Sequence, residues 1–150
     1  MPKASFSTLD SKTVSPEKSN SKFISKQNII TEVLHMFISH RDEIPGKKLS
    51  GETLKNVTKQ VLIGPEQGWD DYVMRMFTLE KDGFTPRHNH DWPHILYIVE
   101  GEGTLHIDGV DHPVEAGSTA FVPPGKEHQL MYRGGDKFVF ICIVPKEGDK

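Results

Sequence analysis

The stretch His88–Gly101, HNHDWPHILYIVEG, places three histidines ahead of a strongly apolar run. His88 and His90 are two residues apart, so their side chains point to the same face of an extended strand. Pro93 interrupts that strand, and His94 then begins the next apolar run and can return to the same site. Three protonatable rings on one buried face are costly unless a cation uses their lone pairs. The stretch therefore predicts a metal site where two strands meet.

The rest of the chain from residue 57 onward has the pattern of an all-β protein. Its short runs are rich in β-branched and aromatic residues, and Gly, Pro or Asp punctuates nearly every run. Eight runs are expected to be strands, namely VTKQVLIG, DYVMRMFTLE, ILYIVEG, GTLHIDG, VDHPVEAG, TAFVPPG, HQLMYRGG and KFVFICIVP. Short strands at such close spacing indicate a β-barrel or β-sandwich. Asp108-Gly109 predicts a hairpin turn, whereas Pro93, Pro123 and Pro124 must lie at strand ends or in turns.

Three segments follow from this pattern. Residues 1–22 are rich in Ser, Lys and Thr and have little to bury, so we expect a flexible tail. Residues 23–56 form an N-terminal extension, in which apolar residues at helical spacing indicate a short helix, a strand, or one passing into the other. Within it, PGKKLSGE is expected to be a loop. Residues 57–150 are expected to form the barrel.

Composition narrows the function classes. The 150 residues carry a formal net charge of -3 without a basic stripe, so nucleic acid is not an expected partner. The single cysteine, Cys142, allows no internal disulfide, which fits a reducing compartment. No apolar run approaches the ~20 residues of a membrane span, and the first residues lack the apolar core of a secretory signal. We therefore expect a cytoplasmic protein that has no membrane partner.

A fourth histidine completes the candidate ligand set. His128 begins HQLMY directly after the turn VPPGKE, and so stands at a strand start like His94. Four imidazoles at strand ends can converge on one ion. The remaining histidines are expected to be surface or satisfied core residues; they are His35, His40, His106 and His112.

Two motifs in this chain resemble the cupin superfamily. GFTPRHNHDWPHILYIVEG is similar to the first cupin motif, with matches at Gly83, His88, His90 and Gly101. GSTAFVPPGKEH is similar to the second, with matches at Gly117, Pro123, Gly125 and His128. The usual glutamate of the first motif is His94 here, as in small single-domain cupins whose metal is held by four histidines. The resemblance implies a cupin double-stranded β-helix, or jelly-roll barrel, with manganese or iron and dioxygenase-like activity.

Replacing the glutamate by histidine changes the charge of the expected site. Four neutral imidazoles leave the full charge of a divalent ion uncompensated, which strengthens its attraction for an anionic ligand. Imidazole also suits Ni, Co, Cu and Zn, so the residues alone do not choose the metal.

Four further residues are candidates for the substrate pocket. The alternation of FVFICIVP puts Phe140 and Cys142 on one face, and the family pattern turns that face toward the metal. Cys142 is equally well understood as a small buried hydrophobe. Arg75 can line the cavity mouth and bind a carboxylate, or face solvent or a partner subunit. Trp92 can shield the ligands from water or pack on the surface.

The expected chemistry is metal-centred oxidation. No Asp or Glu is evident on the face that carries the histidines, so general acid–base catalysis has few candidates. We expect a dioxygenase-type oxidoreductase that acts on a small apolar or aromatic molecule. The alternatives are a non-enzymatic sensor or carrier of a small ligand, and a metal-dependent isomerase or lyase. Apolar residues on both faces of the strands, such as Ile95 beside Leu96, predict a homodimer.

Overall fold

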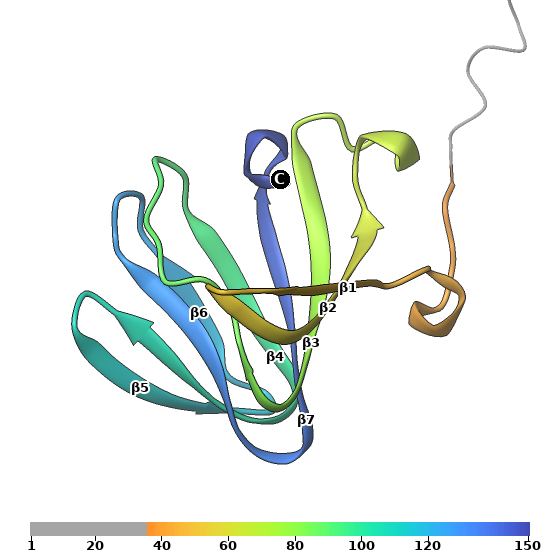
Figure 1. The fold of residues 1–150 in the computed structure, drawn as a ribbon. Coiled ribbons are helices and arrows are strands. Elements are labelled where there is room, and N and C mark those ends of the chain that lie inside the picture. Colours follow the sequence, from red (N-terminus) through yellow and green to blue (C-terminus); the bar gives the residue numbers. More distant parts are fainter. Residues whose placement is uncertain (1–35) are drawn as a thin grey trace, which may run out of the picture. The chain divides into compact units, whose positions relative to one another are not determined.

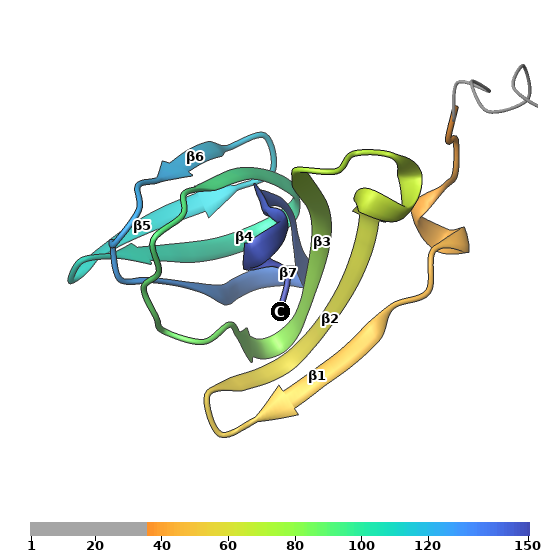
Figure 2. The same cartoon turned by 90° about the horizontal axis from the view of Figure 1, so that it is seen from above.

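The computed structural model describes residues 36–150. In this part of the chain seven strands form one antiparallel sheet in the order β1-β2-β3-β7-β4-β5, and β6 also pairs with β4. The sheet is strongly curled, so that one face encloses an interior (Figures 1 and 2). The strands are β1 (Lys47–Gly51), β2 (Leu54–Ile63), β3 (Tyr72–Phe84), β4 (His94–Ile107), β5 (Val110–Glu115), β6 (Thr119–Val122) and β7 (His128–Pro145). The all-β barrel expected from the sequence is confirmed.

The core lies on the inner face of this curled sheet. Period-two alternation puts Phe138, Phe140, Cys142 and Val144 of β7 inside, and each of these residues is at most 1% exposed. The same alternation in β4 buries His94 in line with Leu96 and Ile98. The expected shared face of the β7 segment is therefore confirmed, and the first histidine of β4 belongs to the interior.

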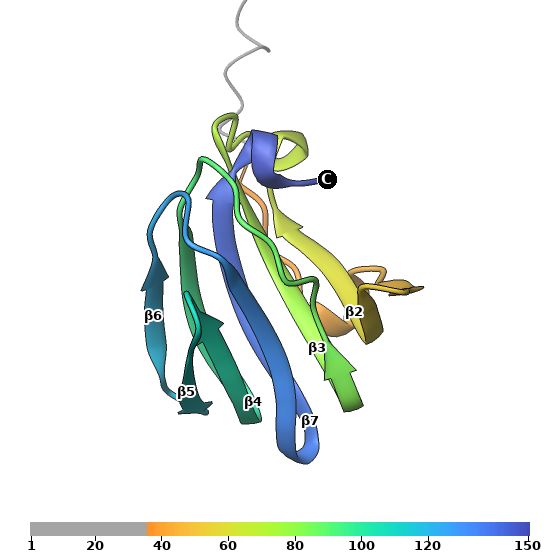
Figure 3. The same ribbon diagram turned by 60° about the vertical axis from the view of Figure 1, so that its left-hand side comes forward.

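Two of the seven strands join segments that the sequence predicts to be separate strands. β4 and β7 each run through two of the expected short strands, and they lie side by side in Figure 3. Gly101 does not end β4; instead the register with β7 shifts there. Its φ of 77° suits glycine, and a Cβ at this position would collide with the carbonyl oxygen of Lys137. The glycine therefore marks an irregularity inside a continuous strand.

The segment PGKKLSGE, which the sequence predicts to be a loop, contains an edge strand. β1 pairs antiparallel with β2, and Leu49 lies opposite Val57 and packs against the core. Leu49 is the only large apolar side chain of β1, so the sequence carries no alternation to reveal the strand. The sheet consequently begins upstream of residue 57.

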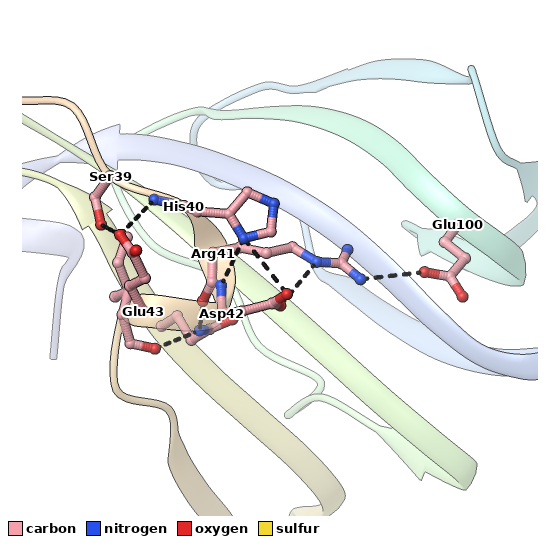
Figure 4. A network of polar contacts seen from close by, with 8 residues as sticks. Ser39, His40, Arg41, Asp42, Glu43 and Glu100 are labelled. Carbon is pink, nitrogen blue, oxygen red and sulfur yellow. Dashed lines mark hydrogen bonds and ion pairs between the residues drawn. The ribbon is translucent and has the colours of Figure 1, made fainter.

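The residues before β1 form no α-helix within the described range. Arg41–Glu43 is a short 3-10 helix, η2, and His40 caps it by accepting a hydrogen bond from the Asp42 N–H at Nδ1 (3.3 Å; Figure 4). Arg41 also lies 3.8 Å from Glu100 of β4. The helix-to-strand interpretation therefore fails for residues 36–44. Its earlier part and the tail at residues 1–22 lie outside the described residues.

The predicted turns are confirmed. Asp108 and Gly109 both have positive φ, and they connect β4 to β5 in a tight hairpin. Pro93, Pro123 and Pro124 all lie outside the strands. Two further 3-10 helices, η3 (Pro65–Gln67) and η4 (Lys146–Gly148), follow β2 and β7.

Across residues 36–150, no helix has both the length and the apolar character needed to span a bilayer.

Candidate metal centre

The four candidate ligands come from three places in the sheet. His88 and His90 lie in the segment between β3 and β4, while His94 and His128 are the first residues of β4 and β7. An isolated antiparallel bridge joins His88 to His128. The two sequence motifs are therefore held together by main-chain pairing, which does not depend on their side chains.

Three of the four rings have nitrogens close to one another. One nitrogen each of His88, His90 and His128 lies within 4.8 Å of the other two. The ring centroid of His94 lies 4.6 Å from those of both His90 and His128, but His94 is not in that group. The three-histidine cluster is thus present, whereas the expected four-histidine site is not confirmed.

Burial keeps these imidazoles neutral. It is the main cause that lowers the pKa of His88 from 6.5 to about 4, and neighbouring His128 adds to it. Burial and then His128 lower the pKa of His94 to about 2. Burial also lowers the pKa values of His90 and His128. At neutral pH the cluster therefore holds uncharged rings, the form that binds metal.

Unpartnered nitrogens in the cluster fit a metal ion. Nδ1 of His128 lies 2.9 Å from the carbonyl oxygen of Lys126 and donates to it, which leaves the Nε2 lone pair free. That Nε2 is buried, as are both ring nitrogens of His90, and none of the three has a hydrogen-bond partner among residues 36–150. Buried nitrogens without partners are costly in a protein interior. A divalent transition metal would satisfy them, and three to four imidazoles are a suitable donor set.

The histidines form one wall of a cavity. Its volume is about 770 Å³, and its apolar lining includes Leu49, Leu54, Phe77, Leu130 and Phe140. Its charged lining residues are all cationic, namely Lys47, Lys48, Lys59, Arg75 and Lys150. Neither Asp nor Glu lines the cavity in the described part of the chain. The space suits a small molecule with an apolar body and an anionic or oxygen-rich end.

All four candidate pocket residues line this cavity. Trp92 stacks on His90, with ring centroids 4.3 Å apart and planes 9° apart. Phe140 stacks on Phe77 at 5.3 Å. Arg75 is 6% exposed.

Arg75 and Cys142 connect the cavity wall to His94. Nη1 of Arg75 donates to the carbonyl oxygen of Gly148 (2.9 Å), and Nη2 donates to Sγ of Cys142 (3.2 Å). That sulfur in turn lies 3.2 Å from Nδ1 of His94. Burial is the main influence on the Cys142 thiol and raises its pKa, against the opposing effect of Arg75.

Several lining residues are absent from the sequence-based set, among them Lys59 and the segment after β7. Lys59 shares a face of β2 with buried Val57, so alternation alone would have found it. Its Nζ lies 2.7 Å from Asp149. The segment Gly148–Lys150 reaches the cavity by folding back after β7, and no local pattern indicates that return.

The histidines outside the cluster contact other groups or solvent. His106 is buried, but its Nδ1 contacts Asp111 and its Nε2 accepts a hydrogen bond from the Gly109 N–H (3.1 Å). His112 is exposed. His40 caps η2 as described, and His35 lies outside the described residues.

Comparison with known proteins agrees with this fold. Residues 75–144 match the family model described as a cupin domain. That segment is similar to the cupin family, and the described residues have the cupin β-barrel fold.

Curated proteins of different names match parts of the chain. An oxalate-binding protein from Thermotoga maritima is 33% identical over 58 residues, which are 38% of this chain and 48% of that protein. A glucose-6-phosphate isomerase from Thermococcus gammatolerans is 32% identical over 72 residues, covering 43% of this chain and 38% of that one. The matches thus span less than half the length of either relative.

Two solved structures show the same fold. The polyketide cyclase RemF from Streptomyces resistomycificus has a TM-score of 0.68 at 28% identity, covering 73% of this chain and 79% of that one. A predicted oxalate decarboxylase from Thermotoga maritima has a TM-score of 0.66 at 24% identity, covering 73% and 98%. The names of these similar proteins describe different activities.

Proposed function

We propose that this chain is a metal-dependent cupin enzyme of dioxygenase type that oxidises a small, largely apolar or aromatic molecule with an anionic or oxygen-bearing end. The metal ligands in this proposal are His88, His90, His94 and His128. The observation that carries it is the cluster of neutral, unpartnered imidazole nitrogens in the wall of a mostly apolar cavity. Manganese and iron are the favoured metals, because the resemblance to four-histidine cupins points to them.

The cavity residues have separable roles in this proposal. A bound Mn or Fe ion would act as a Lewis acid and redox centre. Phe77 and Phe140 would hold the apolar body of the substrate, and Trp92 would exclude water beside His90. The cationic residues at the lining would attract an anionic group. The absence of lining carboxylates in the described part of the chain favours oxidation over an isomerase or lyase reaction that moves protons between carbon atoms.

A second candidate is a non-enzymatic carrier or sensor of a small anion. Its support is the all-cationic set of charged lining residues, together with the similarity to a protein named for oxalate binding. In that case the metal and the cations would hold a carboxylate ligand without converting it.

One pair of measurements separates the candidates. Oxygen uptake by Mn- and Fe-loaded protein is followed with a panel of phenols, enols and small carboxylates, and binding of the same compounds is measured by calorimetry. The enzyme proposal predicts uptake with at least one compound, lost in the His88→Ala/His90→Ala variant and kept in a His112→Ala control. Saturable binding of a carboxylate without any uptake would instead support the carrier.

A further inference from the structure

The position of His94 raises a specific question about the metal centre. Its ring lies beside those of His90 and His128, at 4.6 Å from each, yet its Nδ1 faces the sulfur of Cys142. A neutral imidazole has one N–H and one lone pair. Because Nδ1 is engaged with the sulfur, Nε2 is the nitrogen that His94 has left to offer a metal.

The direction of the hydrogen bond between Nδ1 and the sulfur decides whether Nε2 of His94 can bind a metal. If Nδ1–H donates to Sγ, the lone pair is on Nε2 and His94 can be a ligand. If the thiol donates to Nδ1, Nε2 carries the proton and cannot bind a metal. Cys142 therefore controls the ligand capacity of His94 through the position of one proton.

A metal on Nε2 requires the first arrangement, because the single proton of the neutral ring is then on Nδ1. A guanidinium can only donate hydrogen bonds, so its 3.2 Å contact makes the sulfur an acceptor. Arg75 is itself held in place by the carbonyl of Gly148 and lies 3.7 Å from Asp149.

The sheet register fixes this arrangement. Arg75 of β3 lies opposite Cys142 of β7, and Cys142 lies opposite Leu96 of β4, two residues after His94 on the same face. The neighbouring strands β3, β7 and β4 thus place a guanidinium, a sulfur and an imidazole side by side along the cavity wall.

We propose that Cys142, oriented by Arg75, is the hydrogen-bond acceptor for Nδ1–H of His94 and thereby makes His94 the fourth metal ligand. The sulfur takes the place that a carboxylate or carbonyl occupies behind many metal-binding histidines. This inference rests on the proposed metal centre, and it makes Arg75 and Cys142 positioning residues.

The test measures Co²⁺ affinity by chelator competition, together with the visible spectrum of the bound ion, which depends on the number of nitrogen ligands. Cys142→Val removes the acceptor and is expected to weaken binding about 10–100-fold, the usual loss for an outer hydrogen-bond partner. Its spectrum should match that of His94→Ala. Cys142→Ser keeps an acceptor oxygen and should retain most of the affinity and the wild-type spectrum. Cys142→Ala serves in place of valine if the valine variant does not fold.

The outcomes distinguish this inference from the metal centre itself. Wild-type affinity and spectrum in Cys142→Val would overturn the role of Cys142 and leave the metal centre intact. An equal loss in Cys142→Ser and Cys142→Val would also overturn it, because that result indicates packing alone. Failure of the wild-type protein to bind Co²⁺ would overturn both proposals.

Discussion

His88 and His128 are joined by a reciprocal pair of backbone hydrogen bonds. The His88 N–H donates to the His128 carbonyl oxygen at 3.2 Å, and the His128 N–H donates to the His88 carbonyl oxygen at 2.8 Å. Two ligand-bearing segments that are far apart in the sequence are thus held together by the main chain. The side chains can be replaced without removing this connection, so the metal site can be tested without breaking the fold.

Replacing His88 and His90 together by alanine should abolish stoichiometric metal binding. We expect about one ion per wild-type chain and a small residual fraction in the double variant, measured by elemental analysis after dialysis. Metal that binds only the folded state stabilises it, by about 2.7 kcal/mol at a hundredfold excess over Kd. The wild-type melting temperature should therefore rise with added metal. A similar rise in the double variant would place the binding site elsewhere.

The metal-free protein should lose stability as the pH falls. The folded-state pKa of His88 is about 4, against 6.5 when unperturbed, so below pH 6.5 the unfolded chain binds more protons than the folded one. Stability should be unaffected by His88 above pH 7 and should decrease progressively from about pH 6.5 toward pH 4. Thermal melts in chelator should show this slope, and it should be shallower in His88→Gln. The His112→Gln control should keep the wild-type dependence of stability on pH. If His88→Gln gives the same slope as this control, the pH dependence does not come from His88.

Sequence patterns identified the histidine cluster because its residues occupy positions that local rules define. His94 and His128 begin strands directly after proline-containing turns, and His88 and His90 lie two residues apart in the segment that leads into β4. The two cupin-like motifs add the order in which these strands occur. The same alternation predicted that Phe140 and Cys142 share one face, and both residues line the cavity.

Other features depend on contacts that no local pattern encodes. Gly101 resembles a strand terminator, but pairing with β7 carries β4 through it. β1 is held by its partner strand and contributes one apolar side chain, Leu49. The contact of Arg75 with Gly148 joins residues 73 positions apart. Each of these features depends on tertiary contacts. The local sequence is misleading at Gly101 and uninformative for the other two.

Trp92 should report metal binding. Its ring is stacked on His90 at 4.3 Å, so a bound Cu²⁺ ion would lie close enough to quench its fluorescence. Titration of the wild-type protein should give saturable quenching at one equivalent. The Trp92→Phe variant should lose most of that quenching, whereas Trp69→Phe, which changes the tryptophan beside Tyr72, should retain it. Loss of quenching in the Trp69 variant alone would contradict the location of the site.

We also propose a homodimer that buries the outer face of β4 and β6. Ile95 (52% exposed), Tyr97 (48%) and Phe121 (60%) lie together there, and Ile95 is paired with Phe121 across the strands. Such a cluster favours burial against a second copy. Light scattering at micromolar concentration should give a dimer for the wild-type chain and a monomer for Ile95→Lys/Phe121→Lys. Val110→Lys, which changes an exposed apolar residue of β5, should remain dimeric. A monomeric wild-type chain would exclude the interface.

The most direct test of the central claim is an anomalous difference map from crystals of the Zn²⁺-loaded protein. The proposed metal centre predicts one strong peak per chain among the four rings. Ring nitrogens of His88, His90 and His128, together with Nε2 of His94, should lie at about 2.0–2.1 Å, the usual zinc–imidazole distance. A map with no peak in this cluster, or with its only peak at the His106–Asp111 hairpin or another surface site, would contradict the claim.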